Sequence, residues 1–216
     1  MVSYIGLILK GALVTVQLTV LGFSLAMVVA FITGLCRLSK WGFLRTISLI
    51  YLEFFRGTSL FVQLFWIFFV LPLFGISLTP MQAGVLALAL NVGAYASEVV
   101  RGAILSIPKE QTESCIALNL TKWQSMRYVL LPQAFVIMLP SFGNNAIELL
   151  KATAIVSLIA ISDMTFQAQI VRAQTGNTAI PFLVILALYY IMSSLITFGF
   201  RSLEMKVSEG LDVTKT

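Results

Sequence analysis

The stretch Ser106–Pro132, SIPKEQTESCIALNLTKWQSMRYVLLP, decides how this chain is interpreted. It lies between two long apolar runs and carries five charged residues: Lys109, Glu110, Glu113, Lys122 and Arg127. Charged side chains are costly inside a bilayer, so this stretch is expected to contact water or another protein. The sequence therefore predicts a polar unit between two membrane spans.

The same stretch has the local signals of two short helices. Pro108 suits the first position of a helix, where its missing N–H is not needed. Asn119 tolerates left-handed backbone, so the first helix is predicted to end beside it. Thr121 and Gln124 have the spacing of a capping box that opens a second helix, and Pro132 is predicted to interrupt that helix. We therefore expect a helix, a corner and a second helix.

The composition indicates an integral membrane protein. The chain has 216 residues, of which 59% are hydrophobic and 11% charged, and its mean hydropathy is +0.97. In soluble domains about a quarter of the residues are charged. The net charge of +5 comes from basic residues scattered singly at the ends of apolar runs, which argues against a nucleic-acid partner. The chain has no histidine, so we expect no imidazole base and no metal site.

The apolar runs predict five transmembrane helices in a single domain, residues 1–216. A span needs about 20 apolar residues. The predicted spans cover about residues 11–36, 47–71, 81–102, 133–161 and 181–200. Pro72, Gly75 and Pro80 mark the turn between the second and third spans. The expected fold class is an all-α integral membrane bundle.

The basic residues predict how the bundle is oriented. Ten lysines and arginines fall on the side of the 106–132 unit, whereas only Lys10 and Arg172 fall on the other side. Basic residues concentrate in cytoplasmic loops, so we expect the N-terminus outside and the C-terminus in the cytoplasm. Residues 162–180 then form an outer loop. Its Asp163 and Arg172 are expected to shape a gate or to receive a binding protein.

The third predicted span carries polar residues on one helical face. Asn91, Tyr95 and Glu98 recur at i, i+4 and i+7. A charged side chain within a span normally faces a cavity or a partner, so these residues are candidates for a solute pathway. The alternative is that Glu98 lies near the end of the helix and pairs with Arg101.

The fourth predicted span repeats this spacing at Asn144, Glu148 and Lys151, with Asn145 beside them. We expect Pro140–Gly143 to interrupt this helix, and irregular backbone in a membrane is tolerated only against protein or water. A zwitterionic solute needs an acceptor for its ammonium group and donors for its carboxylate, and these four side chains provide both. The alternative is that Glu148 and Lys151 pair with each other or across an interface and never touch solute.

The polar unit resembles the EAA loop of permease subunits of ATP-binding-cassette (ABC) importers. That pattern reads E, A, A, three residues, G, nine residues, I, one residue, L, P. The corresponding residues here are Glu113, Ser114 and Cys115, then Asn119, then Val129, Leu131 and Pro132. The replacements keep small side chains in place of the two alanines, and a residue able to adopt left-handed backbone in place of the glycine.

Two further segments resemble the same family. Residues 51–63, YLEFFRGTSLFVQ, are similar to the FRGTPLLVQ signature of its polar amino-acid uptake branch. Glu53 and Arg56 in this segment are expected to form an ion pair at i, i+3, a direct role in solute passage being the alternative. The family's GNN and LLKxT words recur at Gly143–Asn145 and Leu149–Thr153. In the family they lie on the helix that lines the translocation path at the dimer interface.

The resemblance implies a type I ABC importer permease in the bacterial cytoplasmic (inner) membrane, with a multi-pass fold. It implies import of polar amino acids or related small zwitterions. The implied partners are ABC ATPase subunits, an identical or sister permease chain, an extracytoplasmic solute-binding protein and membrane lipid. The 106–132 unit would enter an ATPase cleft, with Glu113 near its corner and Trp123 offering apolar contact.

ATP and Mg²⁺ are expected on the partner ATPase, because this chain has no G-x-x-x-x-G-K-S/T loop to hold phosphates. The chain itself is then a transport subunit and not an enzyme. An ion-driven secondary carrier is the alternative, although such carriers usually have inverted repeats and more spans. A membrane-embedded enzyme ranks last, since no nucleophile stands beside a plausible base.

Overall fold

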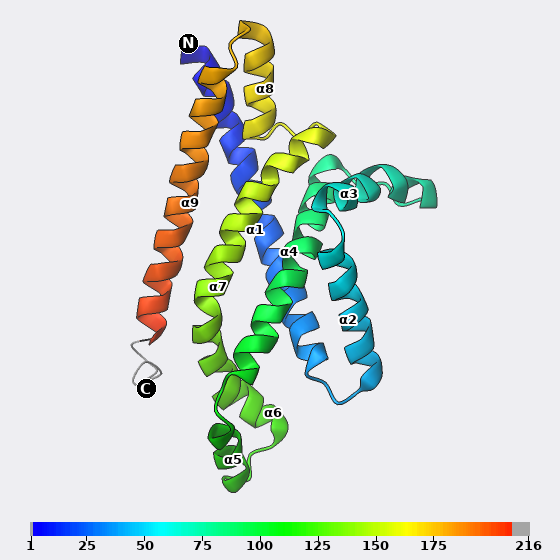
Figure 1. The fold of residues 1–216 in the computed structure, drawn as a ribbon, viewed down its shortest axis with the longest axis vertical. Helices are drawn as coiled ribbons and strands as arrows, with labels where there is room; N and C mark the ends of the chain where they lie inside the picture. Colours follow the sequence, from blue (N-terminus) through cyan, green and yellow to red (C-terminus); the bar gives the residue numbers. More distant parts are fainter. Residues whose placement is uncertain (1, 209–216) are drawn as a thin grey trace.

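The computed structural model describes residues 2–208, which fold into a bundle of helices (Figure 1). The long helices are α1 (Val2–Arg37), α2 (Gly42–Gly57), α4 (Pro80–Leu105), α7 (Leu131–Ala152) and α9 (Ala179–Ser208). Shorter helices are α3 (Leu60–Phe65), α5 (Lys109–Ala117), α6 (Lys122–Gln124) and α8 (Met164–Thr175). Four stretches of π or 3₁₀ geometry complete the order: η1 (Trp66–Val70), η2 (Leu71–Phe74), η3 (Ser125–Leu130) and η4 (Thr153–Ile159).

The centre of the bundle is the close packing of α1 against α4. A Cβ atom added at Gly34 would lie 2.8 Å from the Cβ of Val100, and one added at Gly93 would lie 3.1 Å from the Cβ of Val29. Small residues allow such close approach of helices in membranes, where the hydrophobic effect does not drive helices together. These two glycines therefore set the distance between α1 and α4.

The second predicted span, 47–71, is wrong as a single helix, because the chain bends by 106° between α2 and α3. Thr58 and Ser59 are extended at the bend. The buried Gln63 side chain donates to the carbonyls of Phe55 (2.9 Å) and Thr58 (3.2 Å), and Asn91 donates to that of Phe55 (3.1 Å). Side chains thus satisfy the backbone groups that the break releases, as the membrane interior requires.

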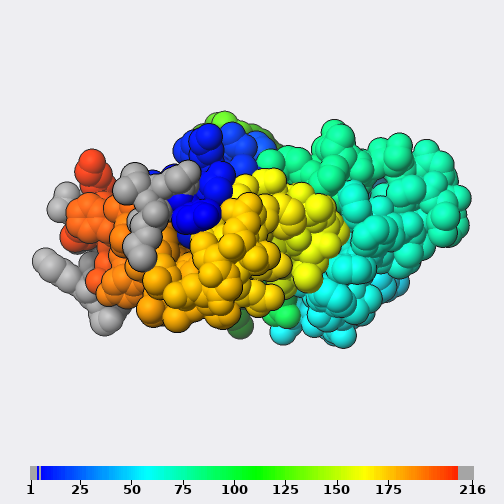
Figure 2. Space-filling view, turned by 90° about the horizontal axis from the view of Figure 1, so that it is seen from above, coloured from blue at the N-terminus to red at the C-terminus, as the bar shows by residue number. Residues whose placement is uncertain are grey.

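The bend sends α3, η1 and η2 sideways as an arm. Seen from the end of the molecule at which α1 begins, this arm extends away from α8 (Figure 2). Among residues 2–208, four helices are long and apolar enough to cross a membrane, and the bent α2–α3 pair makes a fifth crossing if it counts as one broken span. The prediction of five spans holds only in this broken form.

The fourth segment is more continuous than expected. One helical run of 38 residues extends from Lys122 to Ile159, so neither Pro132 nor Pro140–Gly143 interrupts it. In η3 the N–H of Leu131 bonds to the carbonyl of Met126, five residues back. Proline has no N–H to donate, and such π geometry lets the carbonyl groups near it accept hydrogen bonds from other N–H groups. The second helix of the 106–132 unit is therefore the lower end of the fourth span.

The predicted outer loop 162–180 contains α8. The carboxylate of Asp163 accepts hydrogen bonds from the N–H groups of Thr165 (3.2 Å) and Phe166 (2.9 Å), and Gly176 ends the helix with a φ of 66°. A Cβ at Gly11 would lie 2.7 Å from the Asp163 carbonyl oxygen, so α8 is seated tightly against α1. Asp163 is wholly buried and caps a helix, so the expectation that it receives a binding protein is wrong.

Candidate functional site

The first candidate site is the unit formed by α5, its corner and α6, at the end of the molecule opposite α8 (Figure 1). Asn119 has a φ of 53°. Its N–H bonds to the carbonyl of Ile116 (2.9 Å), and the N–H of Leu120 bonds to that of Cys115 (3.0 Å). These two bonds form a complete Schellman motif, with asparagine at the left-handed position. The predicted corner is confirmed.

The start of the second helix is also confirmed. The N–H of Thr121 donates to the Gln124 side chain (2.9 Å), and the N–H of Gln124 donates to the Thr121 hydroxyl (3.3 Å). Both halves of the capping box are therefore formed. The first helix begins at Lys109, with Pro108 just before it as the N-cap. Local side-chain chemistry fixes the geometry of this corner.

The unit presents a mixed acidic and apolar surface. Glu113 and Asn119 are exposed, as is Trp123, at 63%. Ile116 is 67% and Leu118 73% exposed. Neither was predicted as a contact residue, although apolar residues in so polar a stretch indicate one. Contiguous exposed apolar side chains rimmed by polar ones mark protein contact sites. The surface is suited to a protein partner.

The remaining residues of the EAA-like pattern are divided between the interior and the surface of the unit. Cys115 is 2% exposed, and Leu131 packs against the cluster of buried side chains at the lower ends of α1, α4 and α7. The Ser114 hydroxyl is exposed and donates to the Glu110 carbonyl (2.8 Å). Pro132 is exposed at the start of α7. The motif thus combines exposed contact residues with residues that hold the unit in place.

The second candidate site is the polar face of α4, which the structure turns toward α1 and α2. Asn91 is bonded to Phe55 and, at 3.0 Å, to Gln63. The Tyr95 ring lies beneath the Arg56 guanidinium, 5.4 Å from centroid to Cζ. These side chains brace the bend after α2, and solute contact is not needed to explain them.

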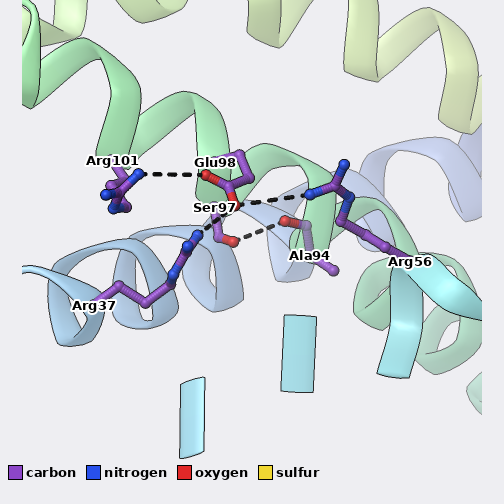
Figure 3. A network of polar contacts seen from close by, with 6 residues as sticks. All are labelled: Arg37, Arg56, Ala94, Ser97, Glu98 and Arg101. Atoms are coloured by element: carbon purple, nitrogen blue, oxygen red, sulfur yellow. Dashed lines mark hydrogen bonds and ion pairs between the residues drawn. The ribbon is translucent and has the colours of Figure 1, made fainter. Parts of the chain in front are cut away.

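Glu98 binds arginines from three helices (Figure 3). Its carboxylate lies 2.6 Å from Arg37 of α1, 3.7 Å from Arg56 of α2 and 3.9 Å from Arg101 of α4. The alternative that Glu98 pairs with Arg101 is therefore correct but incomplete. The predicted pair between Glu53 and Arg56 is wrong: Glu53 is exposed, and the Arg56 side chain reaches across to α4 instead.

The third candidate site is the polar face of α7. Asn144, Glu148 and Lys151 are all exposed, and no ion pair joins Glu148 to Lys151 in residues 2–208. Asn145 points the other way, is 8% exposed, and its side-chain N–H₂ has no hydrogen-bond partner within this part of the chain. Charged groups at membrane depth normally face protein or water. Within residues 2–208, neither Glu148 nor Lys151 has an ion-pair partner on this face.

Asn144 also borders a small cavity between α7 and α9. The cavity has a volume of about 200 Å³ and is lined in part by Thr197, Arg201 and Glu204. Sequence analysis did not select these three residues of α9. No hydrogen bond or ion pair between described residues connects the α7 face to the α4 face. The two predicted parts of a solute pathway therefore have separate surroundings.

Comparison with known proteins identifies the family. Residues 8–209 match the family described as "Binding-protein-dependent transport system inner membrane component". The chain belongs to this family. It is a multi-pass subunit of the inner membrane, and the permease interpretation is confirmed over that of a secondary carrier. Partnership with ATPase subunits and a binding protein is implied by the family.

Relatives and solved structures agree with this assignment. The chain is 42% identical over 212 residues to the "Probable amino-acid ABC transporter permease protein y4tF" of Sinorhizobium fredii, covering 95% of this chain and 89% of the relative. It is 33% identical over 205 residues to the glutamine transport system permease protein GlnP of Escherichia coli, covering 94% of each.

One solved structure, described as an amino acid ABC transporter with histidines, has a TM-score of 0.88 and 34% identity. The match covers 95% of this chain and 96% of that one. The inward-facing MetNI methionine transporter has a TM-score of 0.78 at 24% identity, covers 93% and 96%, and shares the fold. The expected importer-permease architecture is confirmed.

Proposed function

We propose that this chain lines the path of an importer for amino acids or related small zwitterions, and that the α5–corner–α6 unit couples it to ATP hydrolysis on separate subunits. The observation that carries the proposal is the exposed surface of Glu113, Ile116, Leu118 and Trp123 on a corner closed by the Schellman motif and the capping box. The surface is rigid and apolar at its centre, as a docking element requires.

The unbroken run from Lys122 to Ile159 supports a mechanical link. The run includes the 22 residues of α7, which extend about 33 Å at about 1.5 Å per residue. It joins Trp123 in the docking surface to Asn144, Glu148 and Lys151 on the polar face of α7. Movement of the docked unit would therefore tilt that face directly. Nucleotide would shift the balance between two states through its different affinity for each.

The uncovered face of α7 supports a second permease chain, identical or sister, across the path. Two facing polar surfaces would enclose water and solute away from lipid, which removes the cost of exposing Glu148 and Lys151 to the bilayer. Glu148 would accept from the ammonium group of an amino acid, and Lys151 with Asn144 would donate to its carboxylate. The relatives named for amino-acid and glutamine transport support this solute class.

Uptake by the reconstituted transporter tests the proposal. The chain is assembled in liposomes with an ABC ATPase and a solute-binding protein from the same organism, and ATP hydrolysis and uptake are both measured. Replacing Glu113 by alanine is expected to abolish uptake and the stimulation of hydrolysis by loaded binding protein, with normal folding. Glu53→Ala is the matched control, an exposed glutamate far from the unit, and should leave stimulation unchanged. Wild-type stimulation in Glu113→Ala would refute the coupling role.

A further inference from the structure

A basic pocket lies where α1 ends, α2 begins and α4 ends, close to the α5–α6 unit. Its volume is about 350 Å³, and its walls include Arg37, Arg45 and Arg101 together with Ser39, Leu49 and Leu105. The three guanidinium groups come from three different helices. The pocket is separate from the α7 face and from the exposed surface of the α5–α6 unit.

The pocket has more positive charge than residues 2–208 neutralise. Arg37 and Arg101 share the Glu98 carboxylate with Arg56, so one negative charge serves three guanidinium groups. Arg45 is exposed and has no carboxylate partner within residues 2–208. Four cations therefore stand near one anion.

Two lysines add to this field at the same end of the molecule. The side chains of Lys40 and Lys122 lie close enough for their positive charges to repel each other. Lys40 belongs to the turn between α1 and α2 that also forms the pocket wall. The surroundings of the pocket thus favour a ligand with negative charge.

The surface around the pocket is that of a membrane interface. Trp41 and Phe43, in the turn and at the start of α2, are each 73% exposed, and Leu105 is 57% exposed. Exposed aromatic side chains of this kind concentrate at the level of lipid headgroups. Basic groups and apolar side chains lie side by side here, so a ligand with a charged head and an apolar body fits better than a free ion.

We propose that the pocket of Arg37, Arg45 and Arg101 binds the phosphate of an anionic phospholipid. Guanidinium groups hold phosphate oxygens through paired N–H donors, and basic pockets between transmembrane helices at the cytoplasmic side bind anionic headgroups. Leu49 and Leu105 would contact the glycerol and the upper acyl chains. The lipid would hold the α1–α2 turn to the end of α4, directly above the unit proposed to meet the ATPase.

Thermal unfolding of the full-length chain, purified with the partner subunits it retains, tests this site. Phosphatidylglycerol is titrated against phosphatidylcholine with the same acyl chains. Phosphatidylglycerol is expected to raise the Tm of the wild type. Arg45→Gln is expected to weaken the apparent affinity of the chain for phosphatidylglycerol about fivefold, because one basic group near a membrane surface contributes about this much. Arg45 takes no part in the Glu98 cluster, so this change leaves that cluster intact.

Two control variants and one further ligand make the result decisive. Arg45→Lys should keep most of the effect, and Arg172→Gln, an exposed arginine on α8 at the other end, should keep all of it. Native mass spectrometry should show phosphatidylglycerol retained by the wild type in excess phosphatidylcholine. Equal affinity in wild type and Arg45→Gln would overturn the proposal. Equal stabilisation by inorganic phosphate would overturn the lipid assignment.

Discussion

The polar residues of α4 and α7 have the same spacing in the sequence, but they differ in whether the structure provides them with partners. Glu98 on α4 is surrounded by three arginines. Asn91, also on α4, donates hydrogen bonds to Phe55 and Gln63. Glu148 and Lys151 on α7 have no such partners within the described chain. Polar groups that the chain itself satisfies hold the fold, whereas those left open need a partner. The difference separates structural from functional residues where helical spacing alone does not.

The largest effect expected from this comparison is on stability. Arg37 is only 11% exposed, so replacing Glu98 by glutamine leaves a nearly buried cation without its counter-charge. Because Glu98 itself is partly solvated, we expect a loss of about 2–3 kcal/mol, less than for a fully buried pair. Unfolding by denaturant in detergent measures this loss. Glu148→Gln is the matched control and should change stability by less than about 0.5 kcal/mol.

A second variant tests the bracing of the bend. Asn91→Ala removes the donor to the Phe55 carbonyl and to Gln63, leaving polar groups unsatisfied at membrane depth. We expect a loss of about 2 kcal/mol, the usual cost of such groups. Asn144→Ala, on the open face, should cost almost nothing in the same denaturant experiment. Equal losses in both variants would show that the two faces do not differ.

Transport should show the reverse pattern. Glu148→Gln is expected to lower uptake by about tenfold, equivalent to about 1.4 kcal/mol, because one charge–charge contact to the solute is lost. Uptake of labelled amino acid into liposomes measures it, with protein amount and thermal stability checked in parallel. Glu53→Gln, an exposed glutamate on α2, serves as the control. Unchanged uptake in Glu148→Gln would assign its face to packing alone.

The smallest effect concerns the cap of α8. Burial raises the pKa of Asp163 above its ordinary 3.8, while bonds from Thr165 and Phe166 oppose the shift. A raised pKa means that the folded state holds the proton more tightly, so stability declines as the pH rises from near 3.8 through the folded value. Asp163→Asn should keep the cap and remove this slope. Asp163→Ala should lose the cap, at about 1 kcal/mol. Thermal unfolding between about pH 3.5 and pH 7, a range that covers the ordinary carboxyl pKa, measures both the pH dependence and the loss of the cap.

Local chemistry made some parts of the molecule predictable. The corner at Asn119 and the box of Thr121 and Gln124 depend on residues within a few positions of one another, and both formed as expected. The helix α8 also had a local signal, Asp163 before the helix and Gly176 after it, and was missed because its segment is less apolar than a span. Hydropathy alone hides short helices that pack against spans.

Other parts depend on contacts between distant residues. The bend after α2 is held by Gln63, within the segment, and by Asn91 of α4, which is 28 positions away from Gln63. Arg56 pairs with Glu98 and not with the nearby Glu53, because the fold packs α2 against α4. Pro132 did not end its helix because η3 rearranges the hydrogen bonds before it. Tertiary contacts contributed to the first two outcomes, and a local π-helical rearrangement produced the third.

A second permease chain is proposed to complete the polar face of α7. A photoreactive amino acid at position 144, in the assembled transporter in its native membrane, tests this arrangement. We expect an adduct that joins two permease chains from this position, and only lipid adducts from position 186 on α9, where Leu186 is 66% exposed. Lipid adducts alone from position 144 would show that no second chain covers this face.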